Sequence, residues 1–380
     1  MTVLRWTTAG ESHGPALLGI LEGLPSGLAL DFARIDGELA RRRSGHGRSG
    51  RMKLESDAVE VLAGVRAGRI LGSPLALRIT NFDATIERLP VPTSARPGHA
   101  DLAGCQKHTA RDPRSVLERA SARETAMRTA LGAAARQVLE HFGIEIFAHV
   151  TSLGGVDAAL DAFESAGERR VALREASEFA GLDATVESRW RESVERAREQ
   201  GDTLGGVFEV RALGLPPGLG NYQSAGERLT ARLGAALFSI PAIKGVEFGL
   251  GFASARLPGS DVHDSIVLRP GRYGRFGRAS NRAGGLEGGM TTGETLLVRV
   301  AMKPISTLRR GLSTVDFESG AQVLSTYQRS DVSAVPAASV VGEAVVALEL
   351  ARAFLEKFGG DSLAQVEASV ADYVERLREL

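Results

Sequence analysis

The chain has 380 residues, 43% of them hydrophobic and 24% charged, and its 46 acidic side chains balance its 46 basic ones. This composition excludes a disordered or fibrous protein and is typical of a soluble globular chain that forms one large domain or two ordinary ones. Because the net charge is zero, the whole molecule is not attracted to nucleic acid or to a membrane surface, and affinity for anions must come from local arginine clusters.

Hydrophobic periodicity predicts both helices and strands along the chain. The strand candidates are 3–8, 75–81, 146–152, 206–213, 246–252, 265–269 and 295–302. The helix candidates are 31–43 with Asp31 as its cap, 115–142 with Gly143 after its end, and 337–358. The last is apolar around most of its circumference, which predicts burial against a sheet or a partner subunit. Residues 156–203 are charged and favour helix, so they are predicted to form a solvated helical insertion without a chemical role.

Short segments of the first half recur in the second half in the same order. The five pairs are 23–28 with 214–219, 37–42 with 226–233, 59–64 with 246–251, 75–79 with 296–300, and 136–143 with 352–359. Each similarity is weak, but the shared order predicts an internal duplication. We therefore expect a single domain over 1–380, with a pseudo-repeat of about 1–150 and 204–380 and the insertion 156–203 near the seam.

The stretch "GESHG" at 10–14 places an acid, a hydroxyl and an imidazole between two glycines. Glycines allow a tight turn close to a ligand, and His13 could transfer a proton near neutral pH. The alternative is an ordinary turn with a polar surface histidine. In "ARPGHAD", 95–101, a loop similarly presents His99, which on its own is as well explained as a surface residue.

Arginine-rich segments provide candidates for anion binding. "RRRSGHGRSGRMK" at 41–53 has five arginines among three glycines, which favours an anion-binding loop over an RNA-binding or merely solvated segment. "LERASARETAMR" at 117–128 could hold a phosphate at a helix start, although Ser121 and Glu124 also fit a capping box. "MKPIST" at 302–307 suits a phosphate tail, and "QRSDVSAVPAA" at 328–338 carries an Arg–Asp pair of the kind that is usually structural.

Several common site signatures are absent from the sequence. There is no P-loop, no Gly-x-Gly-x-x-Gly at a helix start, no His-Glu-x-x-His and no Gly-x-Ser-x-Gly. A flavin or dinucleotide would therefore need another mode of binding. The glycine-rich loop 281–294 could be merely flexible, but its Gly-Gly-x-x-Gly-Gly spacing indicates a group close to its backbone. The single cysteine, Cys105, excludes an intrachain disulfide and a cysteine-based zinc site, and no metal site is predicted.

Together these segments resemble chorismate synthase over nearly the whole chain. The resemblance lies in "GESHGPALLGILEGLP", "ERASARETAMRTALGA" and "RSDVSAVPAASVVGEAV", with "RPGHADL", "GDTLGGVFEV", "KGVEFGLGF" and "GGLEGGMTTGE" in the same order. It implies an α+β fold, a duplicated β-α-β sandwich with long central helices, assembled as a homotetramer. It also implies a lyase that converts 5-enolpyruvylshikimate 3-phosphate to chorismate and phosphate. The reaction would be a 1,4-elimination that requires reduced FMN, as the last step of the shikimate pathway in aromatic amino-acid biosynthesis.

The resemblance also implies roles for individual residues. His13 would protonate the departing phosphate, His99 would lie near the flavin N1/O2 edge, and Asp331 would assist proton removal at the N5 side. The substrate's anionic groups would be bound by Arg42, Arg51, Arg96, Arg123 and Arg329. FMN would be bound by Arg119, Ala120, Ser121, Pro241, Ala242, Gly288, Lys303, Pro304, Ile305, Ser306, Thr307 and Arg329. NADPH, as a reductant, would be bound by Arg42 and Arg48.

Two positions depart from the family's pattern. Ala120 stands where a second serine is common, which removes one hydroxyl contact to FMN. Pro241 stands where asparagine is usual, and a proline has no backbone N–H to donate. The chain has no large extra reductase domain, so the resemblance favours the elimination activity alone. It leaves open whether NADPH or an external flavin reductase supplies the electrons.

Two other functions are weighed against this one. A flavin reductase would consume NAD(P)H as its main task, and an RNA-binding protein would be built around the Arg-Gly loop at 41–51. Net neutrality and an aromatic content of only 5% argue against RNA binding, which usually needs stacking platforms. The sequence shows no signal-peptide pattern and no run of about 18 apolar residues, so we expect a cytoplasmic protein with no membrane or nucleic-acid partner.

Overall fold

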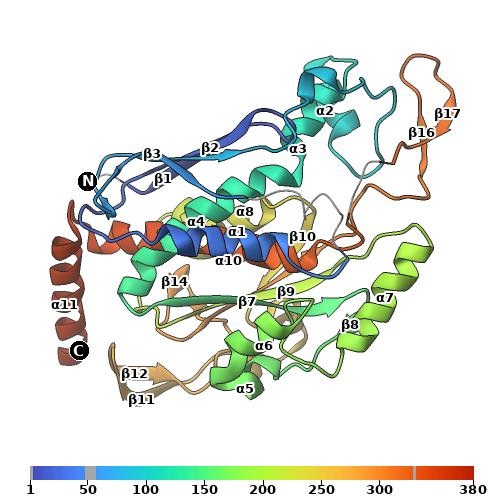
Figure 1. The fold of residues 1–380 in the computed structure, drawn as a ribbon. Coiled ribbons are helices and arrows are strands. Elements are labelled where there is room, and N and C mark those ends of the chain that lie inside the picture. The colour runs from blue at the N-terminus through green and yellow to red at the C-terminus, as the bar shows by residue number, and fades with distance from the viewer. Residues whose placement is uncertain (1–2, 48–56, 328–330) are drawn as a thin grey trace.

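Two antiparallel sheets enclose a layer of helices in the computed structural model, which describes residues 3–47, 57–327 and 331–380 (Figure 1). The first sheet has the strand order β1 (Arg5–Ala9), β2 (Ala16–Glu22), β6 (Leu75–Thr80), β3 (Glu60–Ala63). The second has the order β10 (Ile243–Phe248), β15 (Leu296–Met302), β9 (Gly206–Leu213), β7 (Glu145–Leu153), β8 (Val156–Asp157). All neighbouring strands are antiparallel. The architecture is α+β.

The helix layer consists of α1 (Phe32–Arg43), α4 (Thr125–His141), α8 (Leu229–Phe238) and α10 (Val335–Phe358). Helices α4 and α10 pack against each other in the middle, with α4 also against β2 and α10 against β7 and β9. Alternating residues face this layer, such as Leu17 and Leu21 of β2, whereas Leu18 and Ile20 on the other face are exposed. The main core therefore lies between the sheets, around the two central helices.

Shorter elements surround this sandwich. The small hairpins are β4 (Val65–Arg66) with β5 (Arg69–Ile70), β11 (Ile266–Gly271) with β12 (Gly274–Arg278), β13 (Leu286–Glu287) with β14 (Met290–Thr291), and β16 (Ser313–Val315) with β17 (Gln322–Leu324). The remaining helices are α2 (Asp101–His108), α3 (Arg114–Ala120), α5 (Ala162–Ala166), α6 (Arg170–Ala176), α7 (Glu187–Glu199), α9 (Gly259–Val262) and α11 (Leu363–Glu379). Within the described ranges, no helix combines the length and the apolar character needed to cross a bilayer.

The predicted helix 31–43 is confirmed, with the Asp31 side chain accepting from the first backbone amides. The predicted helix 337–358 is also confirmed and begins two residues earlier, at Val335. The single helix predicted over 115–142 is wrong. Ser121 adopts an extended conformation (φ −65°, ψ 145°), which separates α3 from a short 3₁₀ turn and from α4. This break turns Ser121 and its neighbours toward the candidate site described below.

Most predicted strands are confirmed to within two residues. The exception is 246–252, which begins earlier, at Ile243, and ends at Phe248, because Gly249 and Gly251 take positive φ values and a 3₁₀ helix follows. Strand β2 and helix α11 are not among the predicted elements. Residues 156–203 contain α5, α6 and α7 but are not fully solvated, because Phe179 and Trp190 lie in the main core.

The two sheets share a strand order, and we propose that this reflects the duplication. The order β1-β2-β6-β3 matches the order β7-β9-β15-β10, and the paired sequence segments fall at equivalent places, such as 23–28 after β2 and 214–219 after β9. We propose that the second unit begins with β7, at residue 145, rather than at 204. The insertion 156–203 then lies between β7 and β9, inside the second unit and not at the seam.

Candidate active site

A cavity of about 500 Å³ opens where the starts of α4 and α10 come together. Its volume is typical of a site for a small molecule. Its walls come from both halves of the chain: the 96–100 loop, the α3–α4 junction, 240–242, 302–307 and the segment that leads into α10. The lining residues are Ser12, His13, Arg42, Arg96, Gly98, His99, Ala100, Leu117, Ala120, Ser121, Ala122, Arg123, Thr125, Ile240, Pro241, Ala242, Met302, Lys303, Ile305, Ser306, Thr307, Asp331, Ala334, Ala337, Ala338 and Val341.

His13 is held against α3 by the carboxylate of Glu118. The ring Nδ1 lies 2.9 Å from Glu118 Oε2 and 3.1 Å from Oε1, and the His13 backbone amide donates to Oε2 at 2.9 Å. Arg114 donates to Oε1 of the same carboxylate at 3.0 Å. Burial raises the pKa of Glu118, but the hydrogen bonds from His13 and Arg114 outweigh it, and the pKa lies below its ordinary value. The carboxylate is therefore ionised at neutral pH.

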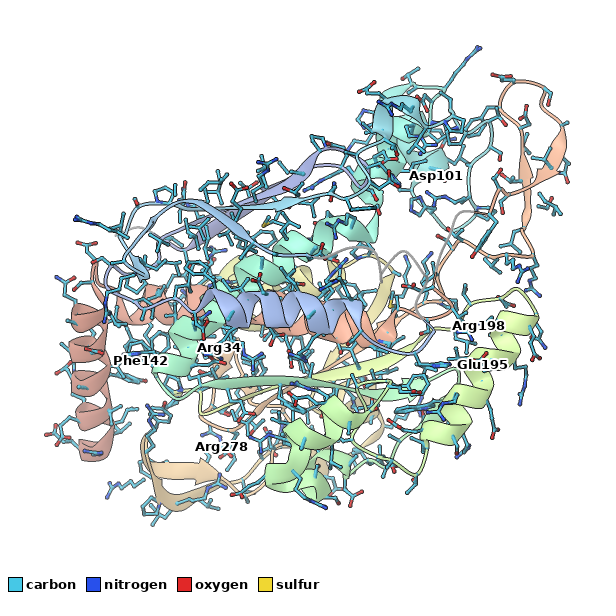
Figure 2. The ribbon with its side chains drawn as sticks, viewed as in Figure 1. Arg34, Asp101, Phe142, Glu195, Arg198 and Arg278 are labelled. Carbon is cyan, nitrogen blue, oxygen red and sulfur yellow. The ribbon has the colours of Figure 1, made fainter. Side chains whose placement is uncertain are left out.

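His99 has a carboxylate partner as well, Asp101 at the start of α2 (Figure 2). The His99 Nδ1 lies 2.5 Å from Asp101 Oδ1, and Arg96 Nε donates to Oδ2 at 2.8 Å. Burial raises the pKa of Asp101, but its hydrogen bonds with His99 and Arg96 hold that pKa well below the usual range. Both cavity histidines are thus oriented by an ionised carboxylate.

Two buried arginines face the cavity from the first half. Arg42, next to last in α1, donates from Nε to Thr125 Oγ1 at 3.0 Å and from Nη2 to the carbonyl of Ala122 at 2.8 Å. Arg123 donates to Asn81 Oδ1 at 2.9 Å and to Asp57 Oδ1 at 2.7 Å. Because neighbouring groups hold these guanidinium groups in place, little side-chain entropy would be lost when they bind an anion.

Lys303 extends the basic wall from the second half. Its ammonium donates to the carbonyl of Gly98 at 2.5 Å, and its backbone amide donates to the carbonyl of Ala242 at 3.0 Å. Burial, and then the nearby charge of Lys244, lower the pKa of Lys303. Beyond it, Thr307 Oγ1 lies 3.4 Å from Arg96 Nη1. This side of the cavity offers an ammonium, a guanidinium and hydroxyls to one anionic group.

The structure brings most of the sequence-predicted site residues together in this cavity. Those that line it are His13, Arg42, Arg96, His99, Ala120, Ser121, Arg123, Pro241, Ala242, Lys303, Ile305, Ser306, Thr307 and Asp331. Arg119 points elsewhere and donates to the carbonyls of Thr8 and Gly10. Pro304 is not among the lining residues, and Gly288 is in the β13–β14 hairpin, also outside the lining. Arg48, Arg51 and Arg329 lie outside the described residues.

Sequence reasoning missed the carboxylates that orient the histidines. Asp101 is two residues from His99 and could have been found from the stretch "ARPGHAD" itself. Glu118 is 105 residues from His13, and no local pattern links the two. The apolar part of the wall was missed too, because Leu117, Ile240 and Val341 come from three separate elements.

Among the described residues, the lining combines four cationic side chains with two histidines, around a concave site of small-molecule size. Paired histidine–carboxylate groups and arginines held in place are features of an enzyme that acts on a small, multiply anionic molecule.

Comparison with known proteins gives the particular family. The sequence profile described as chorismate synthase matches residues 4–355, and the chain belongs to this family of lyases. A protein named chorismate synthase from Geobacter sulfurreducens is 50% identical over 394 aligned residues, which cover 99% of this chain and 100% of the relative. One from Desulforudis audaxviator is 51% identical, with 99% and 98% covered. A crystal structure titled chorismate synthase matches with a TM-score of 0.82 at 40% identity, covering 100% of this chain and 99% of the other.

Proposed function

We propose that this cavity converts 5-enolpyruvylshikimate 3-phosphate to chorismate and phosphate by 1,4-elimination, as the last step of the shikimate pathway. The observation that carries the proposal is the placement of His13, on an ionised carboxylate, in one cavity with four cationic side chains. The substrate has two carboxylates and a phosphate, so it requires several cations, and its phosphate leaving group requires a proton donor. Membership of the chorismate synthase family supports the same reaction.

The residues present fit FMN. The apolar wall of Leu117, Ile240 and Val341 could accept the flavin ring, and Lys303 with the hydroxyls of Ser306 and Thr307 could hold its phosphate tail. When bound in reduced form, FMN supplies the electron density that assists cleavage of an unactivated C–H bond. The proposed contacts of Arg119, Pro304 and Gly288 with FMN receive no support from this cavity, since none of the three lines it.

The residues of the cavity have separate roles in substrate binding, proton donation and flavin binding. Arg42, Arg96 and Arg123 bind and orient the anionic groups of the substrate, together with Arg51 and Arg329. His13 donates a proton to the phosphate as it leaves. His99 would hold the N1/O2 edge of a bound flavin, and Asp331 would assist proton removal on the N5 side, since both residues line the cavity. We further propose that the protein is a cytoplasmic homotetramer. Its FMN would be reduced either by NADPH bound at Arg42 and Arg48 or by an external flavin reductase.

The test is anaerobic phosphate release from 5-enolpyruvylshikimate 3-phosphate, with and without photoreduced FMN. Phosphate and chorismate absorbance should appear together, and only with reduced FMN. Steady NADPH oxidation without phosphate release would instead indicate a flavin reductase. Strongly salt-dependent RNA binding by a flavin-free protein would indicate the RNA-binding alternative.

His13→Ala tests the proton donor. Loss of a positioned general acid lowers turnover by about 10²- to 10⁴-fold, and FMN titration should give nearly the wild-type affinity, because the proposed phosphate and ring contacts are on other residues. Single-turnover phosphate release measures the first effect and flavin fluorescence quenching the second. Wild-type turnover by His13→Ala would remove His13 from the mechanism.

A further inference from the structure

We propose that Glu118 is a positioning residue that fixes one tautomer and one ring orientation of His13, so that the proton passes through Nε2 alone. The inference rests on the proposed role of His13 as proton donor and adds to it the group that prepares the ring. Neither residue type nor sequence spacing suggests this pair, since 105 positions separate the two side chains.

The contacts leave His13 little freedom. The Glu118 Oε2 accepts from both the backbone amide and the ring Nδ1 of His13, each at 2.9 Å, so one oxygen fixes the main chain and the imidazole together. The backbone amide of Ser12 donates to the carbonyl of Glu118 at 3.0 Å. Glu118 is only 2% exposed and is itself held by Arg114. Three hydrogen bonds therefore attach the 12–13 segment to α3.

Gly10, three residues before His13, allows the chain to turn so that residues 12–13 bind to α3. Gly10 has a φ of +110°, and a Cβ there would lie 2.4 Å from the carbonyl oxygen of Ala16, so no other residue fits without a shift. The "GESHG" stretch is thus a tight turn, as its glycines indicate. The turn directs His13 at a buried carboxylate and does not leave it on the surface.

The charge of Glu118 determines the tautomer. A carboxylate accepts hydrogen bonds and cannot donate, so the ring nitrogen beside it, Nδ1, must carry a hydrogen. The pKa of Glu118 lies below its ordinary value, which keeps this carboxylate ionised across the neutral range. Among the described residues, Arg114 lies behind Glu118, and Asp83 lies on the other side of the ring, with its Oδ2 3.9 Å from Nε2. Nε2 is thus the nitrogen turned away from Glu118.

This arrangement suits a proton donor that must be restored after each turnover. The imidazolium gives its Nε2 hydrogen to the phosphate oxygen as the C–O bond breaks, and the electron pair of that bond leaves with the phosphate. The imidazole that remains has its hydrogen on Nδ1, which is the tautomer that Glu118 already binds. No hydrogen must move between the ring nitrogens, and uptake of one proton at Nε2 from solvent restores the donor.

The tautomer can be measured directly by solid-state ¹⁵N NMR of the histidine-labelled full-length chain at a pH where His13 is neutral. The chain has seven histidines, and the spectrum of His13→Ala identifies the His13 signals by difference. The wild type should show a protonated Nδ1 and an unprotonated Nε2. Glu118→Leu removes both carboxylate oxygens that accept hydrogen bonds. Glu118→Gln leaves one accepting oxygen for three donors, which are the His13 backbone amide, the His13 Nδ1 and the Arg114 guanidinium. Both should therefore populate the Nε2–H tautomer.

Two further variants are matched controls. Glu124→Gln makes the same chemical change at another buried carboxylate, which pairs with Arg128 and not with His13, and should leave the tautomer unchanged. Asp83→Asn removes the carboxylate on the Nε2 side and should also leave Nδ1 protonated. A tautomer that changes in Asp83→Asn but not in the Glu118 variants would overturn the proposal. A wild-type spectrum with Nε2 protonated would overturn it as well.

Kinetics complete the test. Loss of the carboxylate that orients a catalytic histidine lowers kcat by up to about 10⁴-fold in the Ser-His-Asp triad. Here the loss should likewise appear in kcat with little change in KM, because the substrate-binding arginines are untouched. Normal turnover by His13→Ala would refute the proposed role of His13 while leaving the tautomer result intact. A wild-type tautomer in both Glu118 variants would refute the role of Glu118 even if His13→Ala is inactive.

Discussion

Ala242 shows how single residues form the cavity wall. Its φ of 69° lies in the left-handed region, which residues with a Cβ rarely adopt, and its carbonyl accepts from the Lys303 amide. Pro241 and Ala242 both line the cavity, so this conformation shapes the wall itself. A strained residue on a cavity wall is a common sign of a functional position.

Substitutions at Ala242 should reveal this strain. Ala242→Val adds a β-branch at positive φ and should lower the free energy of unfolding by about 1–3 kcal/mol. Ala242→Gly should leave it nearly unchanged, because relief of about 1 kcal/mol of strain offsets the greater freedom of glycine in the unfolded chain. Urea unfolding measures both. Equal stability of the valine and alanine proteins would show that the left-handed conformation costs nothing here.

The sequence predicted single residues well where their chemistry is local. His13, His99 and Lys303 stand in stretches whose glycines, prolines and charges indicate a presented side chain, and all three line the cavity. Their partners could not be predicted when they come from distant segments, as Glu118 does, because pairing over such distances is decided by packing. Roles that depend on bound substrate or cofactor remain predictions.

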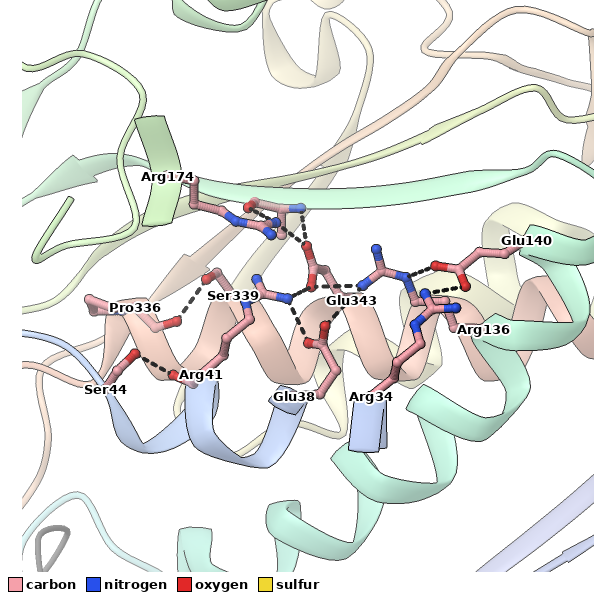
Figure 3. Close-up of polar contacts among 11 residues, drawn as sticks. Arg34, Glu38, Arg41, Ser44, Arg136, Glu140, Arg174, Pro336, Ser339 and Glu343 are labelled. Carbon is pink, nitrogen blue, oxygen red and sulfur yellow. Dashed lines mark hydrogen bonds and ion pairs between the residues drawn. The ribbon is translucent and has the colours of Figure 1, made fainter. Parts of the chain in front are cut away.

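At the scale of secondary-structure elements, one buried glutamate joins its own helix to four other elements. Glu343 of α10 accepts from Arg41 of α1 at 2.8 Å, from Arg174 of α6 at 2.8 Å and from the backbone amide of Ala148 in β7 at 2.6 Å, and Arg136 of α4 lies 3.5 Å away (Figure 3). Since Arg41 precedes Arg42, this network fixes the last turn of α1, from which Arg42 reaches the cavity.

Removing the charge of Glu343 should destabilise the protein in a pH-dependent way. Burial raises its pKa, but Arg41, Arg136 and Arg174 outweigh it and lower the pKa to about 2. Glu343→Gln should cost about 3–5 kcal/mol at pH 7, because it leaves the buried guanidinium of Arg174 without its counter-charge. Arg41 and Arg136, by contrast, keep Glu38 as a partner.

The sign of the pH dependence follows from the lowered pKa. The stabilisation is complete above the ordinary glutamate value of about 4.3 and is lost as the pH falls toward the folded-state value, because the wild-type side chain then becomes neutral too. Thermal unfolding should show nearly the same gap between the two proteins at pH 7 and pH 5, and a clearly smaller gap at pH 3. Glu140→Gln, at a more exposed pair with Arg136, should cost less than about 1 kcal/mol. A gap that does not change with pH would contradict the assigned charge state.

Helices and strands were predicted correctly where hydrophobic residues recur with a regular period. They were missed where tertiary packing determines the local conformation. Helix 31–43 has a cap and an apolar face, and it forms as expected. The break at Ser121 could not be predicted, because no proline or glycine lies near it and the surrounding residues favour helix. It results from packing around the cavity, where the Ser121 hydroxyl meets that of Ser12 at 3.2 Å and accepts from the Arg123 amide.

At the scale of the whole molecule, the two halves are joined through α4 and α10. Gly132 of α4 lies against Ala344 of α10, and a Cβ at Gly132 would come within 2.5 Å of the Ala344 backbone. The starts of the same two helices border the cavity, so their spacing also sets the distance between Thr125 and Ala337 on its walls. The five recurring sequence segments predicted two similar halves. They did not predict the contact between Gly132 and Ala344, because a glycine in a helix does not indicate which residue packs against it.

Gly132→Ala should therefore destabilise the protein, although alanine is the better helix former. The gain in helix propensity is about 1 kcal/mol, and the overpacking penalty is about 1–3 kcal/mol, so the net effect is a loss that comes from separating α4 from α10. Gly37→Ala is the matched control, because Gly37 is exposed in α1 and a Cβ there meets nothing within 4 Å. It should stabilise the protein by about 0.5–1 kcal/mol. Opposite shifts of the melting temperature would show that the close helix contact joins the halves, whereas stabilisation by both would mean that α4 and α10 can separate freely.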